Sequence, residues 1–482
     1  MCGIVGRVNC SGRVNEAQVQ AMSALVAHRG PDGSGIHLEP NAGLAHRRLA
    51  IVDRAHGQQP ALSEDSGVIL VYNGEVYNHL ELRRTLEERG HRFSTRCDTE
   101  AILHAHEEHG GVGAARLLRG MFAYAAWEPV PGRLTLVRDR LGIKPLYYAH
   151  LDSGDLLFAS DLRALLVEPQ VDRQLDSLAL SAYLALRYVP GPATMLRGVR
   201  KLPPGAVLVW QNGRVTIERF WRVPLGEHAE DAPARPPTFV EAAGRLCSLL
   251  EEVVAMRRMG EVPLGAFLSG GLDSTLVAAI LAHLARVAGA RPPCTFSVGY
   301  SSEEGAGHDE LSYARQAARA IGSRHREIVV SGADVAEYLP RIVRDLDEPI
   351  ADPAAVSLWF LARRARQEVT LVLSGEGADE VFAGYAIHRR LLLCEKLRRV
   401  PGLAFAASFA RSMLPTGKLK RALALLAAPR PTTGYSGYRG VSRAFDDDEH
   451  PGWGTGSADA ADLLLWPARC CAARAPTLLG RI

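Results

Sequence analysis

This sequence of 482 residues contains little lysine, no long apolar run and no paired cysteine motif. Lysine occurs only at positions 144, 201, 396, 418 and 420, so nearly all basic side chains are arginine. The eight cysteines form no C-x-x-C pair, which excludes a zinc ribbon or a thioredoxin-type motif and favours reduced thiols. Since no apolar run reaches about 18 residues and no leader pattern is present, we expect a cytoplasmic protein without a membrane partner.

The charge balance argues against a protein that binds nucleic acid. Lys+Arg 56 and Asp+Glu 53 leave a net charge of +3, which is too small on this length to favour nucleic acid as a partner. Hydrophobic residues make up 47% and charged residues 23%, which are ordinary values for a globular protein. At about 150 residues per domain, the length predicts two to four domains.

Two patterns of secondary structure divide the chain. In the first third, turn residues separate short strands, and Asp98 is placed to cap a helix. From residue 240 on, apolar strands alternate with amphipathic helices, which predicts a parallel α/β sheet. The first pattern predicts strands at 3–8, 68–72, 121–127, 134–137, 146–149 and 156–159, with helices at 15–27, 79–89 and 98–109. The second predicts strands at 264–268, 294–298, 326–329 and 370–373, with helices at 275–288, 310–320, 335–344 and 380–393.

The segment 224–238 is rich in proline and charge, which favours an exposed linker. We therefore expect one domain at 2–218, a linker at 219–239, a second domain at 240–445 and a tail of unknown structure at 446–482.

Cys2 is a candidate nucleophile. Removal of Met1 would leave a cysteine whose own α-amine, with a reference pKa of about 7.7–8.0, can accept the thiol proton. From its position alone, the alternative is a small buried hydrophobic residue.

Five motifs occur in a fixed order around this nucleophile. They are MCGIVG at 1–6, HRGPDG at 28–33, HRRLAIVD at 46–53, YNGEVYN at 72–78 and DTEA at 98–101. Together they resemble the class II glutamine amidotransferases, N-terminal-nucleophile hydrolases that free ammonia from glutamine, over roughly residues 2–215. The resemblance implies an α+β fold of αββα layers, with Cys2 as the attacking group.

The same resemblance gives roles to other residues of these motifs. Asn73 and Gly74 resemble an oxyanion hole, in which each donor is worth about 2.7–4 kcal/mol of barrier. A type I′ hairpin turn made by the Asn-Gly pair is the alternative. By resemblance, Arg48 binds the α-carboxylate of glutamine and Asp98 its α-amine, with Glu75 nearby.

A loop rich in serine and glycine follows the strand predicted at 264–268. Its sequence SGGLDS, at 269–274, lacks the lysine of G-x-x-x-x-G-K-[ST], but its backbone N–H groups can face an anion at a helix N-terminus. It resembles the PP-loop of ATP pyrophosphatases, which cleave ATP between its α and β phosphates and so release AMP. A Gly-Gly turn with an aspartate cap is the alternative.

A second loop, SGEGADE at 374–380, also follows a predicted strand. Because ligands of parallel sheets gather at the carboxyl ends of strands, we expect both loops to share one site. With DEPIADP at 347–353, they resemble the synthetase domain of glutamine-hydrolysing asparagine synthetases over about 240–395, an α/β parallel-sheet fold of the adenine-nucleotide-hydrolase type. By this resemblance Glu376 assists acyl-adenylate chemistry and Asp379 contacts Mg²⁺ or substrate. Asp273 of the PP-loop is the natural Mg²⁺ contact. The implied ATP-binding residues are Leu268, Ser269, Gly270, Gly271, Asp273, Ser274, Val298, Ser374 and Gly375.

The carboxylates of DEPIADP have two interpretations. Glu348 and Asp352 could belong to the synthetase site, or the carboxylates of this segment could be helix caps and solvated turns. The pattern does not separate these alternatives.

The joined resemblance implies an amidotransferase that uses ATP and Mg²⁺. Glutamine is hydrolysed at the first site, and ammonia amidates an adenylated carboxylate at the second, aspartate to asparagine, with release of AMP and pyrophosphate. Two alternatives stay open: a different carboxylate from cell-surface or polysaccharide synthesis, and a regulatory or binding subunit with glutaminase activity alone. The expected partners are small-molecule substrates, and the family implies a homodimer.

The C-terminal end departs from this family. Beyond about residue 445 the R-x-P-F-L-D segment is missing, and so is the late lysine that contacts ATP phosphate, because no lysine follows Lys420. A frameshift or early stop is one hypothesis, and it predicts that another reading frame encodes the missing segment. A divergent form is the other.

Three further features receive ordinary interpretations. Arg47 is expected to be a solvated neighbour of Arg48. Gly111-Val-Gly113 follows a predicted helix rather than a strand, so it is not a dinucleotide fingerprint. The sequence places His104, His106 and His109 on a helix without an H-E-x-x-H motif, which favours a solvated polar face over a metal site.

Overall fold

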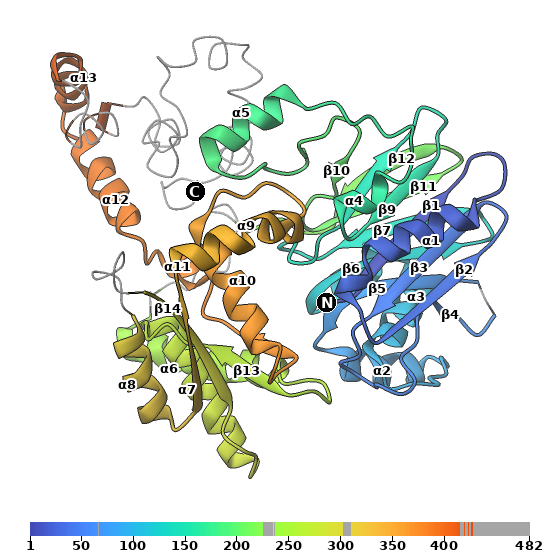
Figure 1. The fold of residues 1–482 in the computed structure, drawn as a ribbon, viewed down its shortest axis with the longest axis horizontal. Coiled ribbons are helices and arrows are strands. Elements are labelled where there is room, and N and C mark those ends of the chain that lie inside the picture. Colours follow the sequence, from blue (N-terminus) through green and yellow to red (C-terminus); the bar gives the residue numbers. More distant parts are fainter. Residues whose placement is uncertain are drawn as a thin grey trace.

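The computed structural model describes residues 1–65, 67–224, 235, 237–301 and 310–414, together with positions 419, 423, 426 and 427. Most of the predicted linker, Lys418, Lys420 and the whole tail at 446–482 lie outside the described residues. No described helix combines the length and apolarity needed to cross a membrane. In Figure 1 the N-terminal elements, coloured blue to green, lie beside the C-terminal ones, coloured yellow-green to orange.

The N-terminal domain is built on two antiparallel sheets of six strands each. The strand order is β10-β8-β9-β1-β3-β2 in the first sheet and β12-β11-β7-β6-β5-β4 in the second. All six strands predicted for this part are present, whereas β2, β3, β4 and β10 to β12 were not predicted. The first sheet contains β1 (Gly3–Val8), β2 (Gly33–Leu38), β3 (Ala42–Arg48), β8 (Tyr147–His150), β9 (Leu156–Ala159) and β10 (Arg200–Lys201). The second contains β4 (Ala61–Leu62), β5 (Ile69–Val76), β6 (Gly120–Glu128), β7 (Arg133–Arg138), β11 (Ala206–Gln211) and β12 (Arg214–Arg219).

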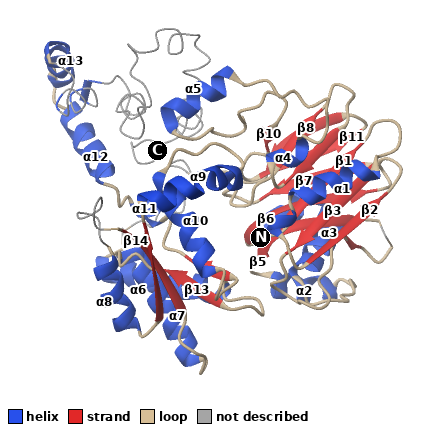
Figure 2. Cartoon of the chain, viewed as in Figure 1, coloured by secondary structure: helices blue, strands red, loops and turns tan. Residues whose placement is uncertain are grey.

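Four layers result from the way these sheets bury their apolar faces. Side chains such as Leu44 of β3 and Val71 of β5 meet in one fully buried cluster between the sheets. Helices cover the outer faces, α1 and α4 over the first sheet and α2 and α3 over the second. The two sheets are drawn in red in Figure 2. The expected αββα fold is therefore confirmed. The helices of this domain are α1 (Glu16–Leu25), η1 (Ala27–Arg29, a 3-10 turn), α2 (His79–Glu88), α3 (Asp98–Leu117), α4 (Leu162–Leu165) and α5 (Ser177–Leu186).

Helix α3 differs from its prediction in burial and in its cap. It continues past residue 109 through a kink at Gly110 (φ 65°), and its N-cap is Cys97, not Asp98. His104 and His106 are each only 2% exposed, because this helix packs on the second sheet. The predicted solvated face is therefore wrong for these two histidines and correct for exposed His109.

The C-terminal domain holds one parallel sheet of four strands in the order β15-β14-β13-β16, which confirms the predicted α/β architecture. Its first helix starts at Phe239, the last residue of the predicted linker, with a capping box made by Thr238 and Glu241. The strands are β13 (Leu264–Phe267), β14 (Cys294–Tyr300), β15 (Arg324–Val330) and β16 (Leu371–Leu373). The helices are α6 (Phe239–Met256), α7 (Leu272–Val287), α8 (Leu311–Ile321), α9 (Gly332–Leu346), α10 (Pro353–Ala365), α11 (Ala378–Phe382), α12 (Ala386–Arg398) and α13 (Leu403–Met413).

One predicted helix of this domain is wrong. The single helix expected at 380–393 is two helices, because α11 ends at Phe382 and Ala383 takes a left-handed conformation (φ 56°). Helix α10 was not predicted at all. Its N-cap is Asp352, whose Oδ1 accepts a hydrogen bond from the Ala354 N–H at 2.9 Å, so the helix-cap alternative holds for this residue.

The loop between α9 and α10 joins the two domains. Asp347 accepts hydrogen bonds from the Leu162 N–H and, at 2.8 Å, from Arg163 Nε. Glu348 Oε2 accepts from the Tyr147 hydroxyl at 2.9 Å and pairs with Lys201 Nζ at 2.8 Å. Glu348 is therefore a contact between domains rather than a solvated turn residue.

Candidate active sites

A cavity of about 320 Å³ lies at the N-terminus of the chain. Its lining contains all six residues predicted for the first site, although they come from four separate segments. They are Cys2, Arg48, Asn73, Gly74, Glu75 and Asp98.

Cys2 lies directly before β1, with its thiol against the end of β3. The Leu49 N–H points to its Sγ at 3.4 Å, and burial raises the pKa of this thiol. The α-amine of Met1 also lies in the cavity, and burial lowers its pKa to about 5. Burial therefore keeps the Met1 α-amine unprotonated at neutral pH.

Asn73 and Gly74 lie inside β5 and not in a turn. They pair with Ala123 and Phe122 of β6, so the hairpin alternative is wrong. Asn73 is 1% exposed, and neither atom of its side-chain amide has a hydrogen-bond partner among the described residues. A buried amide left without partners costs about 1–3 kcal/mol, which marks this group as one kept for a ligand. At Gly74 a Cβ would lie 2.7 Å from the Phe122 Cα, so only glycine fits.

Alternation along β3 separates its two arginines. Arg48 lines the cavity, where its guanidinium donates to the backbone carbonyls of residues 52–54 at 2.6 to 3.3 Å. Arg47 donates to the Ser23 hydroxyl of α1 at 3.0 Å. Arg47 is therefore half-buried and hydrogen-bonded rather than a solvated neighbour.

The carboxylate of Asp98 is turned into the cavity instead of capping its helix. Its Oδ2 accepts from the Tyr72 hydroxyl at 2.8 Å and from the Val76 N–H at 3.0 Å. Burial, assisted by the charge of Asp98, raises the pKa of Glu75 to about 8. Glu75 therefore keeps its proton at neutral pH.

Several cavity residues were not found from the sequence. Lys144 is buried here, which lowers its pKa, while Glu75 and Cys2 oppose that shift. The scarcity of lysine together with an apolar neighbourhood in GIKPLYY was a usable signal. Gln59 and Cys97 line the same cavity, and so do residues 370–372 of the C-terminal domain, for which no sequence signal existed.

The first loop of the C-terminal domain runs from β13 into α7. Gly270 has a φ of 84°, and a Cβ there would lie 2.5 Å from the Ala314 nitrogen, so this position requires glycine. The hydroxyls of Ser269 and Ser274 are 2.9 Å apart across the loop. The N-cap is Gly271 and no side chain caps the helix, so the aspartate-cap alternative for Asp273 is wrong.

The second loop lies against the first. A Cβ at Gly375 would lie 2.6 Å from the Ser274 nitrogen and 2.8 Å from the Asp273 carbonyl carbon. The expected meeting of the two loops is therefore present in the fold.

The other predicted residues of this site differ in exposure. Ser374 and Glu376 are exposed, and Asp379 is half-buried in the first turn of α11. Leu268 and Val298 pack against the apolar clusters beneath the loops.

These loops suit a magnesium nucleotide. The start of a helix offers N–H groups to phosphate, and at Gly270 and Gly375 the neighbouring backbone leaves no room for a Cβ. Asp273 and Asp379 supply the carboxylate oxygens that Mg²⁺ prefers.

Comparison with known proteins matches each domain to a family. A family model described as a glutamine amidotransferase domain matches residues 1–221, and one described as asparagine synthase matches residues 245–461. The chain is 34% identical to the glutamine-hydrolyzing asparagine synthetase 1 of Bacillus subtilis, over 88% of this chain and 65% of that protein. It therefore spans just under two thirds of that relative's length.

Two other similarities extend this comparison. A Methanocaldococcus jannaschii protein assigned as a glutamine-hydrolyzing asparagine synthetase is 30% identical, over 83% of this chain and 79% of its own length. The solved structure of a glutamine phosphoribosylpyrophosphate amidotransferase from Bacillus subtilis aligns with 68% of this chain and 81% of its own at 17% identity and a TM-score of 0.36.

Proposed function

Because the chain belongs to the family of glutamine-hydrolysing asparagine synthetases, we propose that it transfers ammonia from glutamine to an adenylated carboxylate, that of aspartate. The products are glutamate, asparagine, AMP and pyrophosphate. The observation that carries the proposal is the meeting of Cys2, Asn73, Arg48 and Asp98 in one cavity.

Glutamine hydrolysis begins with attack by sulfur. After removal of Met1, the α-amine of Cys2 takes the thiol proton while the Sγ–C bond forms at the carboxamide carbon. The oxygen then carries negative charge, which Asn73 Nδ2 and the Gly74 N–H receive as hydrogen-bond donors. The proton on the amine passes to the leaving nitrogen, ammonia departs, and water hydrolyses the thioester to glutamate.

Opposite charges hold the two ends of glutamine. Arg48 receives the α-carboxylate as a charge-assisted hydrogen-bond donor, and Asp98 receives the α-ammonium. Because Glu75 keeps its proton up to about pH 8, it can donate a hydrogen bond without adding a second negative charge. A Glu75 that carries its proton leaves the contact with the α-ammonium group to Asp98.

The second half-reaction belongs to the two loops of the C-terminal domain. The carboxylate of the acceptor attacks the α-phosphorus of ATP, pyrophosphate leaves, and ammonia then displaces AMP from the acyl carbon. The N–H groups and hydroxyls of Ser269 to Ser274 face the phosphates, and Glu376 assists the acyl-adenylate step. Bound Mg²⁺, held by Asp273 and Asp379, would offset the phosphate charge.

The test uses the purified full chain with amide-¹⁵N glutamine, ATP, Mg²⁺ and aspartate. We expect ¹⁵N-asparagine together with equal amounts of AMP and pyrophosphate. If AMP and pyrophosphate form only with another acid, that acid and not aspartate is the acceptor. Glutamate alone would reduce the function to a glutaminase, and no glutamate from protein with an intact Cys2 thiol would overturn the proposal.

The cytoplasm as the site of action and a homodimer as the active form also belong to this proposal. The six described cysteines are free thiols, in keeping with a reducing compartment. Light scattering coupled to gel filtration measures the mass of the assembly directly.

A further inference from the structure

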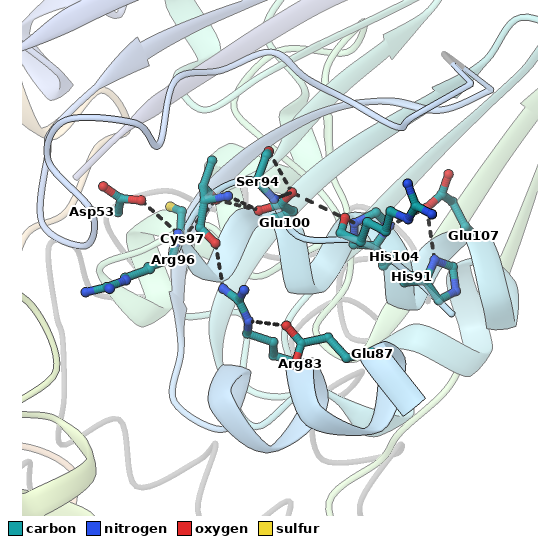
Figure 3. A network of polar contacts seen from close by, with 12 residues as sticks. Asp53, Arg83, Glu87, His91, Ser94, Arg96, Cys97, Glu100, His104 and Glu107 are labelled. Atoms are coloured by element: carbon teal, nitrogen blue, oxygen red, sulfur yellow. Dashed lines mark hydrogen bonds and ion pairs between the residues drawn. The ribbon is translucent and has the colours of Figure 1, made fainter. Parts of the chain in front are cut away.

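A cluster of metal-ligating side chains lies on the N-terminal domain and has no part in the glutamine chemistry (Figure 3). His91 comes from the loop after α2, and His104 and Glu107 lie one turn apart on α3. One ligand atom from each of the three lies within 4.8 Å of the others.

The geometry directs both imidazoles toward one carboxylate. Glu107 Oε2 lies 2.7 Å from His104 Nδ1 and 3.9 Å from His91 Nδ1. The two rings are 4.8 Å apart between centroids. The His104 side chain is 3% exposed, while His91 and Glu107 are about one fifth exposed, so the cluster opens to solvent on one side.

The second nitrogen of each ring already has an acceptor. His104 Nε2 lies 3.1 Å from the Arg92 carbonyl oxygen, and His91 Nε2 lies 3.3 Å from Glu108 Oε2. Metal-ligating histidines characteristically donate this N–H to a carbonyl or a carboxylate, which fixes the tautomer and leaves the other nitrogen for the ion. Both partners of that kind are in place here, and both leave Nδ1 as the ligand atom.

We propose that His91 Nδ1, His104 Nδ1 and a Glu107 carboxylate oxygen bind one Zn²⁺ ion, with water in the fourth position. Two imidazoles and a carboxylate in a tetrahedral set are ligands that Zn²⁺ accepts. The ion would replace the contact between His104 Nδ1 and Glu107 Oε2.

The ion would brace the segment that leads to Asp98. Between His91 and Asp98 the chain is held by Glu100, whose carboxylate accepts from the backbone and hydroxyl groups of Ser94 and Thr95 at 2.6 to 2.9 Å (Figure 3). A metal bond at His91 would add a second anchor at the start of this segment. The role inferred for the ion is to anchor this segment, and the inference does not depend on the proposed glutaminase chemistry.

The test measures zinc on the full chain after treatment with EDTA and dialysis against ZnCl₂ alone. We expect wild type to keep one ion per chain by mass spectrometry and to gain thermal stability from it. His91→Gln should bind Zn²⁺ at least tenfold more weakly and lose that gain. His109→Gln is the matched control, because His109 is an exposed histidine of the same helix outside the cluster, and it should behave as wild type.

Glu108→Gln tests whether the hydrogen bond between Glu108 and His91 contributes to zinc affinity. Loss of such an outer partner typically weakens metal binding about 10–100-fold, although Glu108 touches no metal in this scheme. Equal zinc affinity in wild type and His91→Gln, with both folded by circular dichroism, would overturn the proposal, and so would a wild type that retains no zinc.

Discussion

Replacing Asn73 by alanine removes the side-chain donor of the proposed oxyanion hole and little else. The amide is buried, and neither of its polar atoms has a partner among the described residues. Its loss therefore breaks no described hydrogen bond within the protein. Catalysis and stability should respond to this substitution in different ways.

The expected magnitudes differ accordingly. Removal of one oxyanion donor costs about 10²–10³ in kcat, or about 2.7–4 kcal/mol of transition-state stabilisation. The buried amide itself costs the folded state about 1–3 kcal/mol when it lacks a partner, and its removal offsets the small cavity that alanine leaves. We therefore expect Asn73→Ala to lose glutaminase kcat by two to three orders of magnitude at a nearly unchanged free energy of unfolding.

Gln59 offers a matched control from the same cavity. Its Oε1 accepts from the Tyr72 N–H at 2.7 Å and its Nε2 donates to the Thr99 hydroxyl at 3.2 Å, so both polar atoms of this amide have a partner within the protein. Gln59→Ala leaves a buried N–H without a partner and should lower the free energy of unfolding by about 1–3 kcal/mol.

The assay combines steady-state glutamate release with urea unfolding for both variants. If Asn73→Ala keeps its kcat within tenfold of wild type, or is destabilised as much as Gln59→Ala, the assignment of Asn73 as a donor kept for the oxyanion is wrong.

Three further predictions test the pH dependence, the domain contact and the nucleotide loops. The pKa of Glu75 is raised from 4.5 to about 8, so the folded state holds a proton that the unfolded state loses. The stability of wild type relative to Glu75→Gln, measured as the difference in urea midpoints, should therefore fall as pH rises from 4.5 to about 8. Asp347→Asn keeps the shape but loses the charge that faces Arg163. Charged hydrogen bonds contribute about 1.5–3 kcal/mol each, so this substitution should weaken the contact between the two domains. Less of the ammonia should then reach the second site, and the variant should release more glutamate per AMP formed. An unchanged ratio would contradict a role of this contact in coupling the two reactions. Gly375→Ala places a Cβ 2.6 Å from the Ser274 nitrogen. It should abolish AMP and pyrophosphate formation while glutamine hydrolysis persists, and equal loss of both activities would refute this separation.

Local pattern was sufficient for much of this protein. Alternating apolar residues bounded by turn residues predicted six strands of the N-terminal domain, and the strand-helix alternation after residue 240 predicted the parallel sheet. Five short motifs also identified six cavity residues through their resemblance to the class II glutamine amidotransferases. Both kinds of signal reside within a few neighbouring residues, where a sequence can be interpreted directly.

Tertiary structure decided what depends on partners distant in the chain. The local sequence of Asn73 and Gly74 is also compatible with a hairpin turn, yet pairing with β6 keeps both residues extended in β5. His104 belongs to a polar stretch, yet the packing of α3 buries it beside His91. Contacts such as that between Asp347 and Arg163, 184 positions apart, leave no periodic trace, because burial and pairing are set by which surfaces meet after folding.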